Sequence, residues 1–276
     1  MTSRVSVVVV TYFGGEILRG CLDSLSRVYG AELEIVVVDN ANKGETRDLA
    51  AAYENVRYVA MPRNLGFAGG NNAGLRFCTR ELVLLLNDDT CFHEDSIRPL
   101  VAFLDKSPRV GIVQGTMNMP AAGDRLDDCG AVMTPFGLQI HLERGRPTAT
   151  TALRPRRVTA AKGAMMLIRR RVIDDAGFLF YEHFGSYFEE TDFCRRAANR
   201  GWETWFVPTP PIDHLCGATS GRFDRDEIWT RYFRNIVYSF AHNWGVCGKF
   251  VKLPCFCLAA FVKSPKNILR ALRSFL

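Results

Sequence analysis

Two adjacent carboxylates that follow an apolar run are the first candidates for chemistry in this chain. Residues 82–86 are all apolar and lead directly into Asn87, Asp88 and Asp89. Such a run is typical of a strand buried on both faces of a parallel sheet, and open sheets of this kind bind ligands beyond the carboxyl ends of their strands. Adjacent carboxylates repel each other, so a hard divalent cation is a natural partner. An Asp-rich turn after a strand explains the same residues equally well at this point.

A second acidic cluster opens a predicted helix that runs to Asn199. Glu189, Glu190 and Asp192 fall in its first turn, between aromatic residues. Acidic side chains stabilise a helix N-terminus, which explains one or two of them. Apolar surroundings raise the pKa of a carboxyl, and a raised pKa suits a general base that works near neutral pH. The pattern therefore favours a catalytic carboxylate in this turn.

One histidine and several cations complete the candidates. A lone histidine is more often a packed or surface residue than a ligand, but His214 follows a predicted strand on the same side as the other polar strand ends. That position favours a metal ligand. A predicted amphipathic helix over residues 227–242 carries Arg231 and Arg234, which with Lys249 are available to a phosphate.

The elements that would position these side chains alternate along the chain. Apolar or β-branched runs predict strands at residues 5–11, 34–39, 56–60, 82–86, 110–114, 160–168 and 202–207, with helices between most of them. This alternation of strands and helices predicts an α/β fold with a mostly parallel sheet, whose strands are joined by right-handed crossover connections. Residues 116–160 are irregular, with scattered Gly, Pro and Arg, and are interpreted as an insertion on the acceptor side.

A Gly-rich loop is predicted at residues 62–74, before the strand that ends in the carboxylates. Gly66, Gly69 and Gly70 would let the backbone approach a ligand, and Arg63 would add positive charge. The spacing is neither Gly-x-Gly-x-x-Gly nor Gly-x-x-x-x-Gly-Lys-Thr. A dinucleotide fold or an ATP P-loop is therefore poorly supported.

The distribution of charge is more informative than its total. The net charge is +6, from 35 basic and 29 acidic residues. Residues 246–276 hold six basic residues and no acidic one, so the remaining chain is balanced, with 29 of each sign. This argues against nucleic acid as a partner and for an anionic membrane surface, contacted by a C-terminal amphipathic basic segment. A terminal helix packed on the body, with its basic face in water, is the alternative.

Cysteine usage and hydropathy suggest a cellular location. The chain has nine cysteines, with no Cys-x-x-Cys pair, which favours a reduced cytoplasmic compartment over a disulfide framework or zinc site. The run at residues 5–10 is too short for a signal peptide, and no uninterrupted apolar stretch reaches the ~18–20 residues of a membrane span. We expect a cytoplasmic protein, peripheral on the inner membrane face.

In order and spacing, these motifs resemble the inverting glycosyltransferases of family 2 with the GT-A fold, and within them the bacterial rhamnosyltransferase-like branch. The resemblance covers about residues 5–243. Each motif is weak alone, and their order is specific. The matching residues are Val10-Thr11-Tyr12, Val38-Asp39-Asn40, Arg63-Asn64-Leu65-Gly66, Gly69-Gly70-Asn71-Asn72, Leu86-Asn87-Asp88-Asp89-Thr90, Lys162-Gly163, Phe188-Glu189-Glu190-Thr191-Asp192, His214 and Arg234-Asn235.

The resemblance implies roles for individual residues. A nucleotide-diphosphate sugar would be held by Thr11, Asp39, Arg63, Asn64, Gly66, Asn71 and Asp88. Asp89 would bind Mg²⁺ or Mn²⁺, His214 could complete the coordination, and Glu190 would be the general base. Residues 1–115 would form the nucleotide-binding half of a domain over 1–245, residues 116–245 its acceptor half, and residues 246–276 a separate tail. The chain has Asn-Asp-Asp in place of an Asp-x-Asp-like motif, and Glu where the family often has Asp.

The function implied is metal-dependent sugar transfer with inversion. The first expectation for the donor is dTDP-L-rhamnose, followed by a UDP-hexose, and the acceptor would be a cell-surface glycan or a lipid-linked glycan. A sugar nucleotidyltransferase is the alternative enzyme, but Gly14-Gly15-Glu16 after the first strand has no Lys or Arg before Arg19. A non-catalytic sugar-binding protein of the same fold is a third possibility, and the acidic residues and His214 argue against it.

Overall fold

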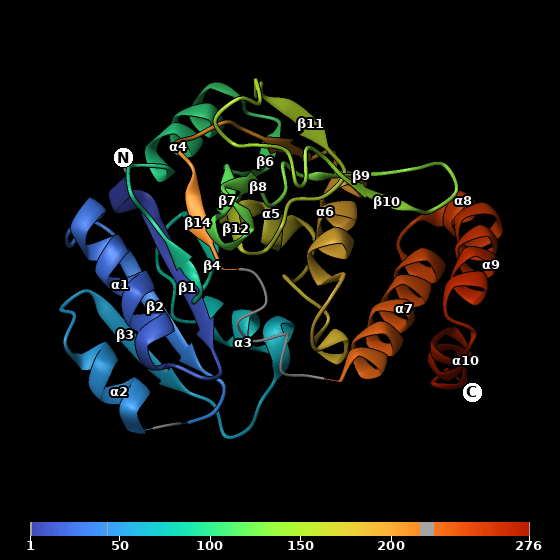
Figure 1. Cartoon of the computed structure of the whole chain (residues 1–276), viewed down its shortest axis with the longest axis horizontal. Coiled ribbons are helices and arrows are strands. Elements are labelled where there is room, and N and C mark those ends of the chain that lie inside the picture. The colour runs from blue at the N-terminus through green and yellow to red at the C-terminus, as the bar shows by residue number, and fades with distance from the viewer. Residues whose placement is uncertain (1, 43, 216–223, 276) are drawn as a thin grey trace.

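The first apolar run forms β1 (Val5–Thr11) near the middle of an eight-stranded sheet in the computed structural model, which describes residues 2–42, 44–215 and 224–275 (Figure 1). β1 pairs in parallel with β2 and β4, and β2 pairs in parallel with β3. From one edge to the other the strands are β11 (Arg156–Val158), β13 (Glu203–Phe206), β6 (Val110–Gln114), β12 (Met165–Arg169), β4 (Leu82–Asn87), β1, β2 (Glu34–Asp39) and β3 (Val56–Ala60).

Two strands run against the rest of the sheet, β12 at its centre and β11 at its edge. β12 is antiparallel to both of its neighbours, β4 and β6, whereas β13 is parallel to β6 and β11 is antiparallel to β13. Residues 115–164 leave the carboxyl end of β6 and return at the same edge of the sheet, so β12 has to run back. The α/β architecture expected from the sequence is confirmed, with this reversal inside it.

Helices cover both faces of the sheet because its strands are apolar on both sides. Val5, Val7 and Val9 point to one face and pack with α1 and α4, and Val8 and Val36 point to the other and pack with α3, α5 and α6. The helices of the body are α1 (Gly15–Tyr29), α2 (Gly44–Ala51), α3 (Gly66–Leu75), α4 (Ile97–Lys106), α5 (Arg170–Asp175) and α6 (Glu189–Asn199), with short helical turns at Thr2–Arg4, Pro120–Ala122 and Glu182–Phe184.

The Gly-rich stretch is a helix, which corrects the predicted loop. α3 begins at Gly66, and a Cβ on Gly70 would lie 2.6 Å from Val10 Cγ1 of β1. A Cβ on Gly74 would lie 2.5 Å from Val8 Cγ1. The absent side chains therefore let α3 lie directly on the sheet. Gly70 and Gly74 serve this packing, whereas a Cβ on Gly69 would lie 2.7 Å from Leu65 Cβ at the start of the same helix.

The segment expected to be irregular, residues 116–160, contains short strands. Two of them, β7 (Met117–Met119) and β8 (Arg125–Leu126), join β5 (Thr90–Cys91) and β14 (Ile212–His214) in a four-stranded sheet. Two others, β9 (Ala131–Met133) and β10 (Gln139–His141), form an antiparallel hairpin. Strands of two or three residues carry too little alternation to be recognised in a sequence.

The end of the described chain forms a C-terminal helical unit, α7–α10. It comprises α7 (Arg225–His242), α8 (Gly245–Cys247), a π-helix (Gly248–Lys252), α9 (Leu253–Lys263) and α10 (Pro265–Arg273), seen at one side of the molecule in Figure 1. Phe233 and Phe240 of α7 share a buried cluster with Phe256 of α9 and Ile268 of α10. Part of the expected tail therefore packs on the body, as the alternative interpretation had it. Gly245–Lys263 also satisfies the length and composition of a membrane-crossing helix, with a mean hydropathy of 1.6 and 22% of that window buried.

Candidate active site

The two carboxylates after β4 lie beside the end of β1. The parallel register pairs Val10 with Asn87, which sets Thr11 next to Asp88. The Thr11 hydroxyl donates a hydrogen bond of 2.6 Å to Asp88 Oδ2. Burial raises the pKa of Asp88 to about 6, although the Thr11 hydrogen bond opposes that rise.

Asp89 meets His214 because the small sheet brings β14 alongside β5. The antiparallel pair places His214 opposite Thr90, and His214 Nε2 lies 3.3 Å from Asp89 Oδ1. Among the described residues, Asp89 Oδ1 is buried and has no hydrogen-bond donor. The amide Nδ2 of Asn87 lies 3.2 Å from the same His214 Nε2. When the ring proton of His214 is on Nδ1, Nε2 and Asp89 Oδ1 are both acceptors, and a cation bound to both would stabilise them.

Asp127 orients His214 from behind. Its Oδ2 accepts a hydrogen bond of 2.7 Å from His214 Nδ1, and the carboxylate also pairs with Lys162 Nζ and Arg144 Nη1. Burial alone would raise the pKa of Asp127, but the His214 hydrogen bond and the charge of Lys162 hold it well below its usual range. A carboxylate on Nδ1 favours the tautomer with the ring proton there, in which Nε2 would serve as a ligand atom beside Asp89.

Glu189 and Glu190 open α6 on the facing wall. Glu189 is buried, and Glu190 is partly exposed to the cavity. Burial, and then the charge of Glu190, raise the pKa of Glu189 well above its usual range. Burial also raises the pKa of Glu190, against the opposing effects of the Gly163 backbone N–H and of Lys162. Burial thus favours the neutral form of Glu189, and Glu190, the more exposed of the two, is the carboxyl of the pair that is placed to accept a proton.

The backbone before Glu190 is held by α7. Tyr187 and Phe188 have φ values of 78° and 72°, in the left-handed region that non-Gly residues rarely adopt. Asn235 Nδ2 contacts the backbone oxygens of Phe184, Ser186 and Tyr187 at 3.0, 3.2 and 2.8 Å. This one amide stabilises a strained turn that positions Glu190.

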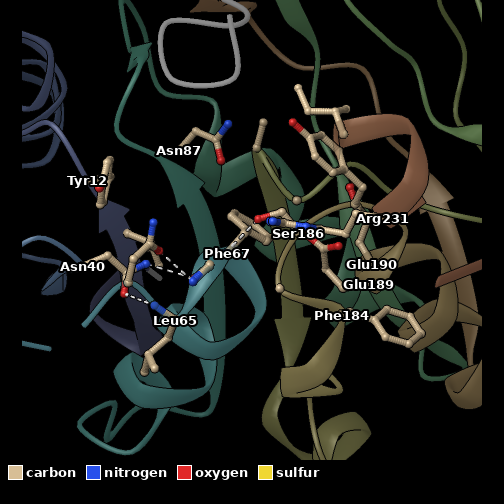
Figure 2. A pocket seen from close by; sticks show the side chains of 18 of the residues that line it. Tyr12, Asn40, Leu65, Phe67, Asn87, Phe184, Ser186, Glu189, Glu190 and Arg231 are labelled. Carbon is tan, nitrogen blue, oxygen red and sulfur yellow. Dashed lines mark hydrogen bonds between the residues drawn. The ribbon is translucent and has the colours of Figure 1, made fainter. Parts of the chain in front are cut away.

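Asp88, Asp89, His214, Glu189 and Glu190 all border one cavity of about 950 Å³, whereas Asp127 and Asn235 lie behind its lining. Figure 2 shows Tyr12 and Asn40 on one side and Glu189, Glu190 and Arg231 on the other. The cavity is large enough for a drug-sized ligand. Its lining includes carboxylates, amides and cations, namely Thr11, Asn40, Asn64, Gly66, Asn87, Asp88, Asp89, Arg144, Lys162, Glu189, Glu190, His214, Arg231 and Arg234.

Residues 6–177 match the model of glycosyl transferase family 2. The chain belongs to this family. The match spans β1 to α5 and includes Asp88 and Asp89, and it ends before Glu190 and His214. The family match therefore covers the donor-side motifs, and the assignment of the base depends on the geometry.

Relatives of this family 2 chain include glycan-building proteins. It is 29% identical over 201 residues to the low-salt glycan biosynthesis hexosyltransferase Agl10 of Haloferax volcanii, covering 71% of this chain and 62% of that protein. It is 23% identical over 232 residues to the dTDP-rhamnosyl transferase RfbF of Shigella flexneri, covering 80% of this chain and 72% of that protein. The chain thus spans less than two thirds of the first relative's length.

Solved structures agree on the fold. The mannosyltransferase PcManGT of Pyrobaculum calidifontis, solved with GDP-Man and Mn²⁺, superposes with a TM-score of 0.61 at 18% identity, covering 98% of this chain and 73% of that one. TarS of S. aureus, residues 1–349, superposes with a TM-score of 0.63 at 18% identity, covering 95% and 73%. The GT-A fold expected from the sequence is confirmed.

The structure brings most of the predicted site residues of this family 2 chain together. Thr11, Asn64, Gly66, Asp88, Asp89, Glu190 and His214 line the cavity. Asp39, Arg63 and Asn71 are not among its lining residues. Asp39 is buried and accepts hydrogen bonds from the Ala41 backbone and the Tyr58 hydroxyl, each 2.9 Å long. The donor roles of these three residues stay predictions.

The cations around the cavity were only partly anticipated. Arg231 and Arg234 line it as expected of phosphate partners, whereas Lys249 lies in the π-helix and not in the lining. Lys162 and Asp127 had no predicted role, although Lys162 belongs to a matching motif. Asp127 lies 87 residues before its partner His214, and only the fold reveals that contact.

Proposed function

We propose that this protein transfers a sugar, with inversion, from a nucleoside-diphosphate donor to a hydroxyl of a glycan. One observation carries the proposal: Glu190, a half-buried carboxyl with a raised pKa, and a second carboxylate centre, Asp88–Asp89, line the same cavity. The first suits proton abstraction, and the second, with its neighbouring cations, suits an anionic donor. Membership of glycosyl transferase family 2 supports the same reaction class.

A divalent metal fits the chemistry of Asp89 and His214. Asp89 Oδ1 and His214 Nε2 are 3.3 Å apart, and the Asp127 carboxylate favours the tautomer in which Nε2 would serve as a metal ligand. Among the described residues, no group of three or more His, Cys, Asp or Glu side chains is arranged as a metal cluster. The donor's diphosphate would supply further oxygen ligands, as is usual for Mg²⁺. When bound, Mg²⁺ or Mn²⁺ would neutralise charge on the departing diphosphate.

The remaining groups bind the donor and move the proton. Arg231 and Arg234 border the cavity and offer positive charge to the diphosphate. The acceptor hydroxyl attacks the anomeric carbon from the face opposite the leaving group, and Glu190 takes the hydroxyl proton. The bond to the diphosphate oxygen breaks in the same displacement. No covalent sugar intermediate forms, so one catalytic carboxylate suffices.

The donor sugar is proposed from the relatives. A dTDP-rhamnosyl transferase is among them, which favours dTDP-L-rhamnose, and solved neighbours with GDP-Man or UDP-GlcNAc bound keep other donors in the test set. We propose a lipid-linked or growing cell-surface glycan as the acceptor. Such an acceptor implies work at the cytoplasmic face of the inner membrane, with the protein attached peripherally.

A thermal-shift screen of nucleotide sugars with Mn²⁺ tests the donor site. A ligand at 100 times its Kd stabilises the folded state by about 2.7 kcal/mol, which raises the melting temperature measurably. We expect one nucleoside-diphosphate sugar to stabilise the parent protein most. No shift with any donor, on a folded protein, would contradict the proposal.

The reaction products distinguish a glycosyltransferase from the alternative enzyme, a sugar nucleotidyltransferase. A glycosyltransferase releases a nucleoside diphosphate from the donor, whereas a sugar nucleotidyltransferase consumes a nucleoside triphosphate and a sugar phosphate and releases pyrophosphate. Chromatography of the nucleotides after incubation distinguishes them. Donor binding without any turnover on a panel of glycan acceptors would favour the non-catalytic sugar-binding protein.

A further inference from the structure

Large apolar side chains are exposed on two segments outside the cavity. One is the hairpin of β9 and β10, where Phe136 is 62% exposed and Leu138 and Ile140 are also exposed. The other is the C-terminal helical unit, where Phe250 is 74% and Val262 80% exposed. Exposed apolar patches of this kind mark an interaction surface when they form one continuous area.

The two segments are joined to each other. Lys252 Nζ donates hydrogen bonds to the backbone oxygens of Thr134 and Pro135, at 2.7 and 3.0 Å. Gly137, with a φ of +84°, lies so close that a Cβ there would be 2.9 Å from a ring carbon of Phe240. Phe136 therefore adjoins the residues held by Lys252, and Phe250 precedes Lys252 by two positions. Figure 1 shows the hairpin reaching α8.

Cations border this apolar area. Residues 246–276 hold six basic residues and no acidic one. Lys252 is committed to the hairpin, and Lys266 pairs with Asp226 at 2.7 Å. Lys249, Arg270 and Arg273 are exposed. Exposed apolar residues interleaved with exposed cations are complementary to a bilayer surface that contains anionic lipid.

We propose that the β9–β10 hairpin tip and the exposed side of α8–α10 form one membrane-contact surface, which rests on anionic lipid. The hairpin is an essential part of it, so the surface extends beyond the C-terminal helices. The protein lies on the bilayer and does not cross it.

Packing argues against a crossing helix. Gly245–Lys263 is long and apolar enough to span, but Phe256 and Ala260 in it are buried in the same cluster as Phe240. Lys252 in the same segment is tied to the hairpin. α10 then returns to α7 and buries Ile268 and Ala271 there. A span would have to break all of these contacts.

The other end of the hairpin leads to the cavity. The Thr191 hydroxyl, next to Glu190 in the chain, lies 3.5 Å from Gln139 Oε1 of β10. Three residues after His141, where β10 ends, Arg144 lines the cavity. A lipid-linked acceptor held at the surface would therefore present its head group on the Glu190 side. This consequence rests on the proposed function, whereas the surface itself does not.

Flotation of the purified full chain with vesicles tests the surface. The vesicles are phosphatidylcholine alone or phosphatidylcholine with 30% phosphatidylglycerol, where this fraction is a design choice of roughly the anionic content needed for a clear surface potential. We expect flotation with the anionic vesicles only, weakened by salt. The triple variant Phe136→Ser, Leu138→Ser, Ile140→Ser should float several-fold less, and Phe136→Ser alone should give a partial loss. Phe178→Ser, an exposed aromatic elsewhere that is 40% exposed, is the matched control and should float like the parent.

Two double variants that make the same change of charge separate local attraction to the membrane from an effect of the protein's total charge. Arg270→Glu with Arg273→Glu should weaken flotation by at least about fivefold for each basic residue removed. Arg109→Glu with Arg171→Glu makes the same change of charge on side chains that are 85% and 79% exposed elsewhere, and should have little effect. Circular dichroism and donor-induced thermal shifts on every variant report folding and the donor site independently.

Three results would overturn the inference. The first is a hairpin variant that floats as well as the parent. The second is equal flotation with neutral vesicles. The third is a parent protein that stays in the vesicles after alkaline carbonate extraction, which would indicate a crossing helix. Failure of every nucleotide sugar to bind would sink the proposed function and leave the flotation result intact.

Discussion

The environment of Glu190 should affect both the rate of sugar transfer and the stability of the fold. Replacing Glu190 with Gln should separate these two effects. Gln keeps the shape of the side chain and can still accept the hydrogen bond from the Gly163 backbone. It cannot take a proton from the acceptor. A positioned general base contributes about 10²–10⁴-fold to a rate. The expected loss of transfer is therefore about 2.7–5.4 kcal/mol of transition-state stabilisation, at 1.36 kcal/mol per tenfold change.

Stability should change in the opposite direction. Burial raises the pKa of Glu190 above its ordinary value of 4.5, so the folded protein holds this proton more tightly than the unfolded chain does. The free energy of unfolding then falls as pH rises from that ordinary pKa through the raised one. Gln has no charge to bury. Glu190→Gln should therefore melt at a higher temperature than the parent above that window and lose the advantage in acid.

The pH profile gives a further test of the same residue. The parent should lose transfer activity as pH falls through the raised pKa of Glu190, because the protonated carboxyl cannot act as a base. Initial rates of nucleoside-diphosphate release, measured with saturating donor and acceptor, follow this acid limb. The residual activity of Glu190→Gln should lack the limb.

Glu189→Gln is the matched control. Burial and the charge of Glu190 raise the pKa of Glu189 well above its usual range, which favours the neutral form that Gln mimics. Its replacement by Gln should retain most of the rate. Equal impairment of the two variants, or transfer by Glu190→Gln at the parent rate, would refute the assignment of the base.

Three other changes have defined outcomes. Asp127→Asn weakens the orientation of His214 and should lower Mn²⁺ affinity about 10–100-fold by calorimetry, whereas Asp128→Asn, its neighbour, should leave that affinity unchanged. Gly66→Ala places a Cβ 2.4 Å from the Gly185 backbone oxygen at a φ of +70°, and should lower the melting temperature through about 1–2 kcal/mol of left-handed strain and a further overpacking cost. A normal melting temperature there would contradict the close contact. Removal of metal with EDTA should abolish transfer and added Mn²⁺ should restore it; full activity in the stripped protein would take Asp89 out of the mechanism.

The parts of the fold with strong local patterns could be predicted from the sequence. β6 lies where the run at 110–114 predicts it, because a continuous apolar run specifies a strand buried on both faces. β3 also lies where residues 56–60 predict it, although it is a partly exposed edge strand. The carboxylates after β4 were recognisable for the same reason. The prediction of a loop was wrong for the Gly-rich stretch. Glycine destabilises a helix, but Gly70 and Gly74 are tolerated in α3 because they let it pack against β1.

The candidate site was less accessible to sequence reasoning where its contacts are distant. Asp127 and His214 are 87 residues apart in the chain. They are brought together by strands of two or three residues, which only tertiary pairing defines. Asn235 was part of a matching motif, but its action on the turn before Glu190 is visible only when α7 lies against that turn. Residue types indicated the chemistry, and the fold determined which side chains support it.

The strand order affects when, during synthesis, the protein becomes able to transfer sugar. β1–β4 are joined by local strand–helix–strand connections, so they can pair while the later chain is still emerging. β13 must instead find β6, pairing Glu203 with Val110, and Asn235 must then reach the turn before Glu190. Closing such distant contacts is slow compared with local pairing. We expect the nascent chain to form its donor-side half first and to acquire a positioned base last, so that a partly synthesised molecule is unable to transfer sugar.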